Sequence, residues 1–548
     1  MRAFRDLISV GFRNLLGNFW VPIGWGGFLC LNVRAALSSF VACALSMGLV
    51  VAASCCLPAL SRPWQQCGRG ARIGVALSTA AVLQVLTVSF LQQLVATGGV
   101  LRKLGMLFQW NLCPIVAVAV GCAVVAAPVI GVLLACFWRV EGPKMVELWR
   151  RMDRTERVGM ALIALCLAGI VSWAYSQAAI TELSFDVIYT TDGTFADNAP
   201  ATFTRIAHGE NDFRQPLFAV CALPFISPFL CLRDLLLPVV TLSRGWCVAM
   251  AQVGLVMISF GWLVRLMALR GRLARLGVVA WLSAGYATLL MCTQVEQYVV
   301  ALFWLSFFLS CRCEERTAWT VGFVGATGAL LTSGALALAH LRWADFRAWR
   351  ALFRQYCCAG VAFVGAFVLF CRTDLLALWT ARTQMYLTFT GKTLAFAERF
   401  RMWLEFVAMN FCAPEAGPTL YTKKVAWHLT AGVSPQPLLC GTLLLGAVLV
   451  GSVLCWRERF VRVCAGWVAF SWLLLCLIGW GTAENGLILY VLYFSWAFVG
   501  IAAKLIERLV GERFAGGVYL LLAAATAWNT LPAFTEMVHF LAQHYPAQ

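Results

Sequence analysis

Charge is scarce in this chain of 548 residues. Only 12 % of the residues are Asp, Glu, Lys or Arg, whereas a soluble domain carries about 25 %. Hydrophobic residues make up 61 % of the chain. An ordinary soluble protein is therefore excluded, and many apolar stretches reach the ~20 residues that a transmembrane helix needs.

Histidine is also scarce, and no disulfide framework is visible. The five histidines are scattered along the chain, which argues against a histidine-ligated metal site. The 23 cysteines lie mostly inside apolar runs, where cysteine behaves as a small hydrophobic side chain. Cys311 and Cys313 stand one residue apart but lack the further ligands that a zinc site requires.

The formal net charge of +17 does not indicate nucleic-acid binding. The basic residues form short clusters at the ends of apolar runs, where the positive-inside rule of membrane proteins places them. No basic stripe is interleaved with exposed aromatic residues, so a nucleic-acid partner is excluded.

Apolar runs of transmembrane length follow one another along the chain. They cover residues 15–32, 35–60, 74–96, 112–138, 158–178, 246–268, 277–293, 296–310, 355–371, 438–455, 464–480, 486–505 and 517–534. Such continuous runs exclude a β-barrel, whose strands alternate apolar and polar residues. We predict an all-α polytopic membrane protein of about 11–14 transmembrane helices.

Two further apolar stretches are interrupted. Residues 216–243 contain four prolines, and because proline removes a backbone donor and kinks a helix, we expect a broken or re-entrant element there. The second stretch, 318–340, contains the small residues of GATGALLTSGA.

Five basic segments mark the cytoplasmic side, at 139–157, 270–275, 342–354, 457–462 and 504–513. All five lie on one side only if residues 318–340 enter and leave the membrane on that side. We therefore predict that this stretch is a hairpin of two half-helices.

Two long loops then face the outer side. The loop at 181–215 holds six acids against two arginines, and the loop at 373–437 holds a group of basic residues. Within the second loop, residues 391–411 have apolar side chains at helical spacing, which predicts an amphipathic helix on the outer membrane surface.

The acids of the first loop have two interpretations. Asp is common in loops because its side chain bonds to the backbone of turns, and TTDGTFADN has that composition. The alternative is catalysis, since a carboxylate at the membrane surface can act as a general base or hold a divalent cation, Mg²⁺ or Mn²⁺, that activates a hydroxyl. The position of the loop between a span and a proline-broken segment favours catalysis for the loop as a whole.

The order of these features resembles the GT-C glycosyltransferases, the class that includes protein O-mannosyltransferases and the lipid A aminoarabinose transferase. The acid of the family's first outer loop corresponds to Asp192 in YTTDGTF, and its His-Pro or Pro-Pro pair corresponds to GENDFRQPLF, where Gln215 replaces the usual histidine. WTVGFVGATGALLTSGA resembles a short membrane dip of the family. The resemblance covers roughly residues 158–358.

The resemblance implies a fold and a reaction. A GT-C-like bundle carries short juxtamembrane helices in its extracytoplasmic loops. It transfers a sugar, here a hexosyl or pentosyl group, from a polyprenyl-phosphate-linked donor to a glycan, lipid or protein acceptor on the extracytoplasmic face. The implied location is the inner membrane of a bacterial cell.

The resemblance also implies site residues. Asp192 or Asp186 is the expected catalytic carboxylate, and basic side chains are expected to bind the donor phosphate. The expected substrate-binding residues are Arg205, Asp212, Arg214, Gln215, Glu296, Lys392, Arg399, Arg401 and Glu484. For Arg399 and Arg401, anchoring of a surface helix is the alternative role.

Four regions follow from these predictions. Residues 1–157 form an N-terminal membrane region of about four helices without an assigned role. Residues 158–372 form the GT-C-like core, residues 373–437 the second outer loop, and residues 438–548 the C-terminal transmembrane helices.

Two other function classes stay open. A transporter or flippase of a lipid-linked or small solute should contain inverted repeats with discontinuous helices at corresponding positions, and one such stretch, 216–243, is visible. A polysaccharide polymerase or ligase would rely on outer-loop arginine and histidine, for which His428 is the candidate.

Overall fold

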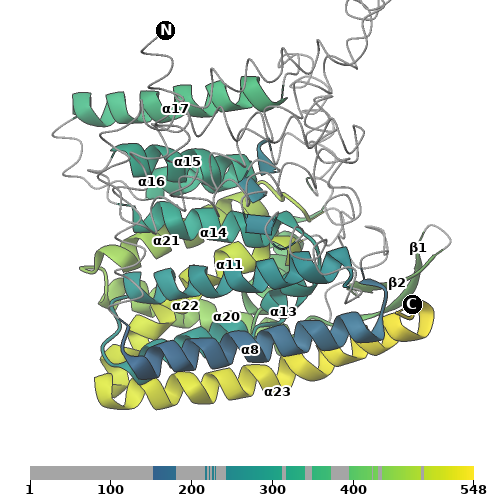
Figure 1. Cartoon of the computed structure of the whole chain (residues 1–548). Helices are drawn as coiled ribbons and strands as arrows, with labels where there is room; N and C mark the ends of the chain where they lie inside the picture. Colours follow the sequence, from purple (N-terminus) through teal and green to yellow (C-terminus); the bar gives the residue numbers. More distant parts are fainter. Residues whose placement is uncertain are drawn as a thin grey trace, which may run out of the picture.

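The computed structural model describes residues 152–180, 216–218, 221–222, 225–226, 229, 242–311, 316–339, 349–371, 390, 394–421, 424–429, 435–482 and 487–547. Within them the chain is a bundle of helices that lie side by side. Helices α8 (Arg154–Gln177) and α23 (Glu512–His544) run together along one edge of it (Figure 1).

The helices between these two overlap the predicted apolar runs. In chain order they are α11 (Arg244–Leu266), α12 (Arg272–Ser283), α13 (Tyr286–Thr293), α14 (Gln297–Ser310), α15 (Arg316–Ala329), the short η3 (Leu331–Ala335) and α16 (Leu336–Ala339), α17 (Trp349–Cys371), α20 (Pro435–Leu454), α21 (Arg459–Ser471) with its π-helical continuation η5 (Trp472–Leu477), and α22 (Ile488–Val510). The runs predicted before residue 152, and most of 216–243, lie outside the described residues.

Six of the described helices are long and apolar enough to cross a membrane, and a bent pair would make seven. They are α8, α11, α20, α21 with η5, α22 and α23. This confirms a helical, multi-pass membrane protein. The total of about 11–14 spans and the GT-C topology stay predictions.

The start of α8 shows how the local sequence sets a helix boundary. The N–H of Glu156 donates to the Asp153 carboxylate at 2.8 Å, and the N–H of Asp153 donates to the Glu156 carboxylate at 3.2 Å. This capping box satisfies two donors that a helix start leaves open. The helix then continues for 24 residues to Gln177.

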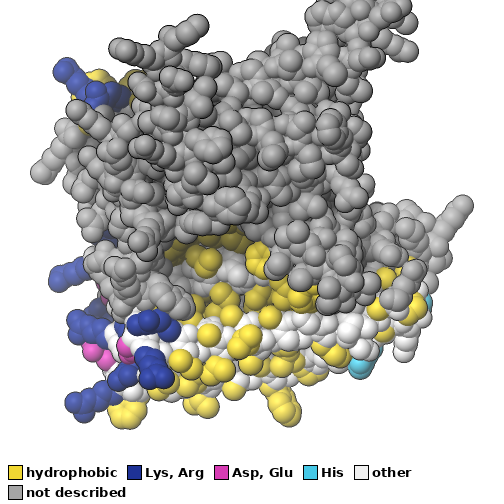
Figure 2. Space-filling model, in the orientation of Figure 1, with side chains coloured by type: hydrophobic (Ala, Val, Ile, Leu, Met, Phe, Trp, Pro, Cys, Tyr) yellow, Lys and Arg dark blue, Asp and Glu magenta, His cyan; other side chains and the backbone are white. Residues whose placement is uncertain are grey.

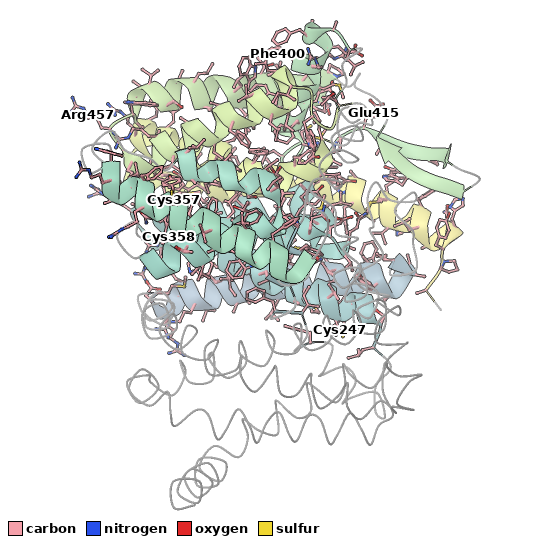
Figure 3. All side chains as sticks on the ribbon, turned by 90° about the horizontal axis from the view of Figure 1, so that it is seen from above. Cys247, Cys357, Cys358, Phe400, Glu415 and Arg457 are labelled. Atoms are coloured by element: carbon pink, nitrogen blue, oxygen red, sulfur yellow. The ribbon has the colours of Figure 1, made fainter. Side chains whose placement is uncertain are left out.

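The two ends of the bundle differ in charge. Lys and Arg gather at one end of the face drawn in Figure 2. At this end Arg275 binds Glu156, and Lys504 lies 3.1 Å from the Glu458 carboxylate and 3.4 Å from the Ala268 carbonyl oxygen. These contacts join four of the five basic segments, so we name this the cytoplasmic end. The opposite end is the outer end; Arg457 and Glu415 lie toward different ends in Figure 3.

Residues 316–339 fold back on themselves. The Tyr356 hydroxyl of α17 donates to the Ala337 carbonyl oxygen at 2.6 Å, and the same ring packs on Trp319 with centroids 5.0 Å apart. A continuous helix would separate residues 319 and 337 by about 27 Å, at ~1.5 Å per residue. One ring could not contact both. The chain therefore folds back as the charge distribution predicted, with η3 at the turn; that this hairpin enters and leaves the membrane on the cytoplasmic side stays a prediction.

The run predicted at 277–293 as one span is bent by 64° between α12 and α13. Groups from other elements satisfy the backbone at the bend. The Thr530 hydroxyl donates to the Ala284 carbonyl oxygen at 2.7 Å, and the N–H of Tyr286 donates to the Asn410 carbonyl oxygen at 3.0 Å. A broken helix is stable at membrane depth because protein surrounds the break.

The second outer loop contains α19 (Phe396–Ala408) and two strands, β1 (Ala416–Tyr421) and β2 (Lys424–Leu429). The amphipathic helix predicted within 391–411 is α19, which packs on α20 and η5. The antiparallel β1–β2 hairpin was not predicted. Its Trp427 is buried and packs on Phe540 of α23, with ring centroids 5.2 Å apart, because an aromatic ring gains from removal from water.

One residue just beyond α11 adopts a strained conformation. Ala268 has φ +51° and is exposed, and the left-handed region costs a non-glycine residue roughly 1–2 kcal/mol. We expect Ala268→Gly to raise the free energy of unfolding by about 1 kcal/mol, measured by thermal unfolding in detergent. Ala161→Gly, in the exposed middle of α8, should lower it by about the same amount. A change in the free energy of unfolding with the same sign in both variants would contradict this explanation.

Candidate functional site

Both ends of the acidic outer loop reach the outer end of the bundle. Before the loop, the N–H of Ala179 donates to the Tyr545 carbonyl oxygen at 2.9 Å. After the loop, the N–H of Leu217 donates to the Gly328 carbonyl oxygen at 2.9 Å. Tyr545 follows the last residue of α23, and Gly328 lies in the last turn of α15, just before η3 at the tip of the hairpin. The residues that flank the loop 181–215 thus contact the end of α23 on one side and the hairpin on the other.

Most of the predicted site residues lie outside the described residues. These are Asp186, Asp192, Arg205, Asp212, Arg214, Gln215, Lys392 and Glu484. Glu296, Arg399 and Arg401 are described.

The segment that follows the acidic loop is fixed to the hairpin and to α14. Besides the bond from Leu217, the Trp304 indole N–H donates to the Cys221 carbonyl oxygen at 3.1 Å. The Cys221 thiol lies 3.5 Å from the Gly325 carbonyl oxygen. The part of the chain that resembles the family's Pro-Leu-aromatic motif, Pro216–Phe218, therefore lies against the hairpin tip.

Glu296 lies at the start of α14, where its side chain is 3 % exposed. Its backbone N–H donates to the Gln252 side-chain oxygen at 3.3 Å. The Gln252 amide in turn donates to the carbonyl oxygens of Met291 at 3.0 Å and Gln294 at 2.6 Å. One buried side chain of α11 thus holds the α13–α14 junction that presents Glu296.

An aromatic group lies next to this junction. We define the outer cluster as Tyr298, Trp480, Tyr490, Tyr493 and Thr332. The rings of Tyr298 and Tyr493 stack with centroids 6.2 Å apart, and Tyr490 meets Tyr298 edge-on at 6.0 Å. The Trp480 indole donates to the Tyr490 hydroxyl at 2.8 Å, and the Thr332 and Tyr493 hydroxyls are 3.3 Å apart. The outer cluster therefore joins α14, α22 and the hairpin tip.

Two hydroxyls of the hairpin tip are buried without a hydrogen-bond partner in the described part of the chain. They belong to Thr327, 5 % exposed, and Ser333, which is fully buried. A buried hydroxyl usually has a partner. These two groups can accept or donate a bond to water or to a ligand at the hairpin tip.

Arg399 and Arg401 lie on α19, also at the outer end. Arg399 donates to the Leu477 carbonyl oxygen at 2.8 Å, at the end of η5, where a cation also complements the helix dipole. Arg401 forms an ion pair with Glu405 at 3.4 Å. Burial raises the pKa of the Glu405 carboxyl, and the Arg401 guanidinium opposes that rise. Phosphate binding by either arginine stays a prediction.

Gln252 and the outer cluster were not among the site residues predicted from the sequence. The signal for Gln252 is a lone amide in the apolar run CVAMAQVGLVMI, and polar groups inside spans are functional candidates. Tyr490 and Tyr493 stand three residues apart in LILYVLYF, which places both on one helix face. Which other elements they meet is not encoded in that spacing.

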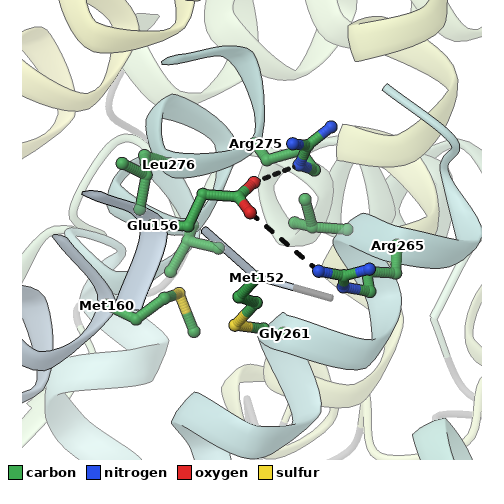
Figure 4. Close-up of a pocket in the computed structure, with 9 residues that line it drawn as sticks. Met152, Glu156, Met160, Gly261, Arg265, Arg275 and Leu276 are labelled. Carbon is green, nitrogen blue, oxygen red and sulfur yellow. Dashed lines mark hydrogen bonds and ion pairs between the residues drawn. The ribbon is translucent and has the colours of Figure 1, made fainter. Parts of the chain in front are cut away.

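The cytoplasmic end has a small cavity of ≈ 20 Å³, lined in part by Glu156, Arg265 and Arg275 (Figure 4). A cavity of this size holds about one water molecule. The Glu156 carboxylate binds Arg275 directly and lies 3.9 Å from Arg265. The carboxylate is therefore already paired, and the cavity is too small for a substrate. We assign the Glu156–Arg275 ion pair a structural role.

Among the described residues, no group of three or more His, Cys, Asp or Glu side chains could hold a metal ion. The acids expected to bind a divalent cation are in the loop 181–215, outside these residues. No protein-family model, curated protein or solved structure matches this chain.

Proposed function

We propose that the chain is an integral-membrane glycosyltransferase of the GT-C type, located in the inner membrane of a bacterium. It moves a sugar from a polyprenyl-phosphate-linked donor to an acceptor hydroxyl on the extracytoplasmic face. The observation that carries the proposal is the hydrogen bond from Leu217 to Gly328. It ties the segment after the acidic loop to the hairpin, whose Thr332 hydroxyl lies 3.3 Å from that of Tyr493 in the outer cluster.

This arrangement supports a surface reaction on a lipid-linked substrate. A polyprenyl chain stays in the bilayer while its phosphate and sugar lie at the outer interface. The acidic loop starts and ends at that level, and α19 brings Arg399 and Arg401 to the same end. Arginine suits phosphate because its guanidinium can donate two parallel hydrogen bonds.

The proposed step is a displacement at the anomeric carbon. Asp192 accepts the proton of the acceptor hydroxyl as this oxygen bonds to the anomeric carbon. The bond between that carbon and the phosphate oxygen breaks, and polyprenyl phosphate leaves with the electron pair. Basic side chains of the outer loops stabilise the phosphate charge. A divalent cation held by Asp192 or Asp186 would supply Lewis-acid activation of the hydroxyl.

We expect Asp192→Asn to lower the transfer rate by about 10²–10⁴-fold, the usual contribution of a general base. The measurement is release of undecaprenyl phosphate from a panel of undecaprenyl-phosphate hexoses and pentoses, in the presence of glycan, lipid or protein acceptors, in proteoliposomes with equal amounts of folded protein. Asp197→Asn is the matched control in the same loop and should retain activity.

Two outcomes of this series would change the assignment. Loss of activity in Asp186→Asn with full activity in Asp192→Asn would transfer the role of base to Asp186. Full activity in both variants would contradict the proposed mechanism.

A flippase is the second candidate, supported by the bent α12–α13 pair and the re-entrant hairpin. Discontinuous helices commonly form substrate sites in transporters. The same proteoliposomes distinguish the two functions. A flippase would move a fluorescent polyprenyl-phosphate lipid between leaflets without releasing sugar, and Asp192→Asn would leave that movement unchanged.

A further inference from the structure

One face of α20 is exposed along most of the helix. Leu439, Leu443, Val450 and Val453 recur at steps of three, four or seven residues, which places them on one face, and they are 50–77 % exposed. Gly446 lies on the same face, where a Cβ would meet no atom of the described chain within 4 Å. Other positions of α20 pack on α19 and α22. We define these five residues as the α20 stripe.

The α20 stripe ends among basic side chains at the cytoplasmic end. Arg457 follows the last residue of α20 by three positions, is exposed, and lies at this end in Figure 3. Arg508, from the last turn of α22, donates to the carbonyl oxygen of Leu454 at 2.5 Å. This bond holds the Arg508 guanidinium within about one turn of Arg457. Because a guanidinium carries five N–H donors, Arg508 can bind a second acceptor as well.

The acids of this corner are engaged elsewhere. Glu458 and Glu507 bind Lys504 at 3.1 Å and 3.0 Å. Both carboxylates thus neutralise a lysine, and the end of the α20 stripe keeps the positive charge of Arg457 and Arg508. A ligand that matches this surface has an anionic group at one end and an apolar chain that follows the helix.

The dimensions of the surface fit one leaflet of a bilayer. From Leu443 to Val453 the α20 stripe runs for about 15 Å, at ~1.5 Å per residue, which is about half of the ~30 Å hydrocarbon core. Trp456 follows and is 54 % exposed, as is typical of tryptophan at the membrane–water interface. The basic segments place this end on the cytoplasmic side, whose leaflet contains anionic lipids.

We propose that the α20 stripe, Arg457 and Arg508 bind one anionic phospholipid of the cytoplasmic leaflet. The two guanidinium groups bind the phosphate, for which arginine is well suited because it can donate two parallel hydrogen bonds. One acyl chain lies along the α20 stripe, where Gly446 leaves room for it. The lipid joins the ends of α20 and α22, and its binding does not depend on the proposed glycosyl transfer.

The test is native mass spectrometry of the full-length protein, released from detergent micelles after titration with phosphatidylglycerol or with phosphatidylcholine of the same acyl chains. We expect the wild type to retain phosphatidylglycerol in preference. Arg457→Gln and Arg508→Gln should each weaken its binding about fivefold, and the double variant about 30-fold, since a cation near the surface contributes about a factor of five. High salt should also weaken it, because salt screens exposed charges.

Two variants serve as controls. Arg354→Gln removes the same charge from an exposed position of α17, in another basic segment, and should leave phosphatidylglycerol binding unchanged. Arg457→Lys keeps the charge and should retain most of the binding, which separates the effect of charge from a change in folding.

Four results would overturn the proposal. The wild type and the double variant could retain phosphatidylglycerol equally, or the wild type could retain both lipids equally. Glycerol phosphate could displace the lipid at equal concentration, which would show that the apolar chain contributes nothing. The spectra could also show a lipid-free dimer that the double variant leaves intact, which would identify this face as an interface between two copies of the chain.

Discussion

Arg275→Ala is expected to destabilise the protein by about 3 kcal/mol, because removal of the closest partner leaves a buried charge with only partial compensation. The Glu156 carboxylate is 5 % exposed and binds Arg275 of α12. In the variant the remaining cation near it, among the described residues, is Arg265 at 3.9 Å. The arginines are 29 % and 23 % exposed, so solvent weakens the effect and we place it at the lower end of the ~3–5 kcal/mol range for buried pairs.

The same helix offers a matched control. Arg272 pairs with Asp153 at 3.4 Å, but these side chains are 61 % and 44 % exposed. Arg272→Ala should therefore change the free energy of unfolding by less than about 1 kcal/mol. Unfolding of purified protein in mixed micelles with increasing SDS measures both variants.

A second substitution tests the reason for the effect. In the Arg275→Ala background, Glu156→Gln should recover part of the lost stability, since a neutral amide is less costly to bury than an unpaired carboxylate. Equal losses for Arg275→Ala and Arg272→Ala, or no recovery in the double variant, would show that this ion pair does not hold α8 against α12.

Gly441→Ala is expected to separate α19 from α20. A Cβ at this position would lie 2.0 Å from the Leu404 carbonyl oxygen and 2.9 Å from its carbonyl carbon. Both atoms belong to the backbone, so no side chain can rotate away and one helix must move. Overpacking typically costs about 1–3 kcal/mol, and we expect about 3 kcal/mol here. Protease cleavage within residues 391–437 should become faster in reconstituted protein.

Gly446→Ala, in the same helix, is the control. A Cβ there meets no atom within 4 Å, and alanine is the better residue inside a helix by about 0.5–1 kcal/mol. This variant should be neutral or slightly stabilising. Equal destabilisation by the two variants would mean that loss of glycine itself, and not contact with Leu404, decides the outcome. Under the proposed function, Gly441→Ala should also raise the KM for the donor, because Arg399 and Arg401 move with α19.

Hydropathy and charge predicted the membrane class, the approximate positions of most described helices, and a hairpin at 318–340, but not the break between α12 and α13. These properties are local: a run of apolar residues is stable only in lipid or in a core, and basic residues stay on the cytoplasmic side. The amphipathic spacing of 391–411 located α19 for the same reason. The catalytic role of the acidic loop and of Asp192 rests on the resemblance to GT-C glycosyltransferases and stays a prediction.

The tertiary structure decided which residues from distant parts of the sequence contact one another. Glu156 meets Arg275 across 119 positions of the sequence, and Gln252 meets Gln294 across 42. The 64° bend of the α12–α13 pair depends on Thr530 and Asn410, which come from distant segments. Hydrophobic burial is non-directional. An apolar pattern therefore predicts that a helix packs against another element, but it does not identify that element. Which helices pack together depends on the shape of their surfaces and on hydrogen bonds that form only when the helices meet.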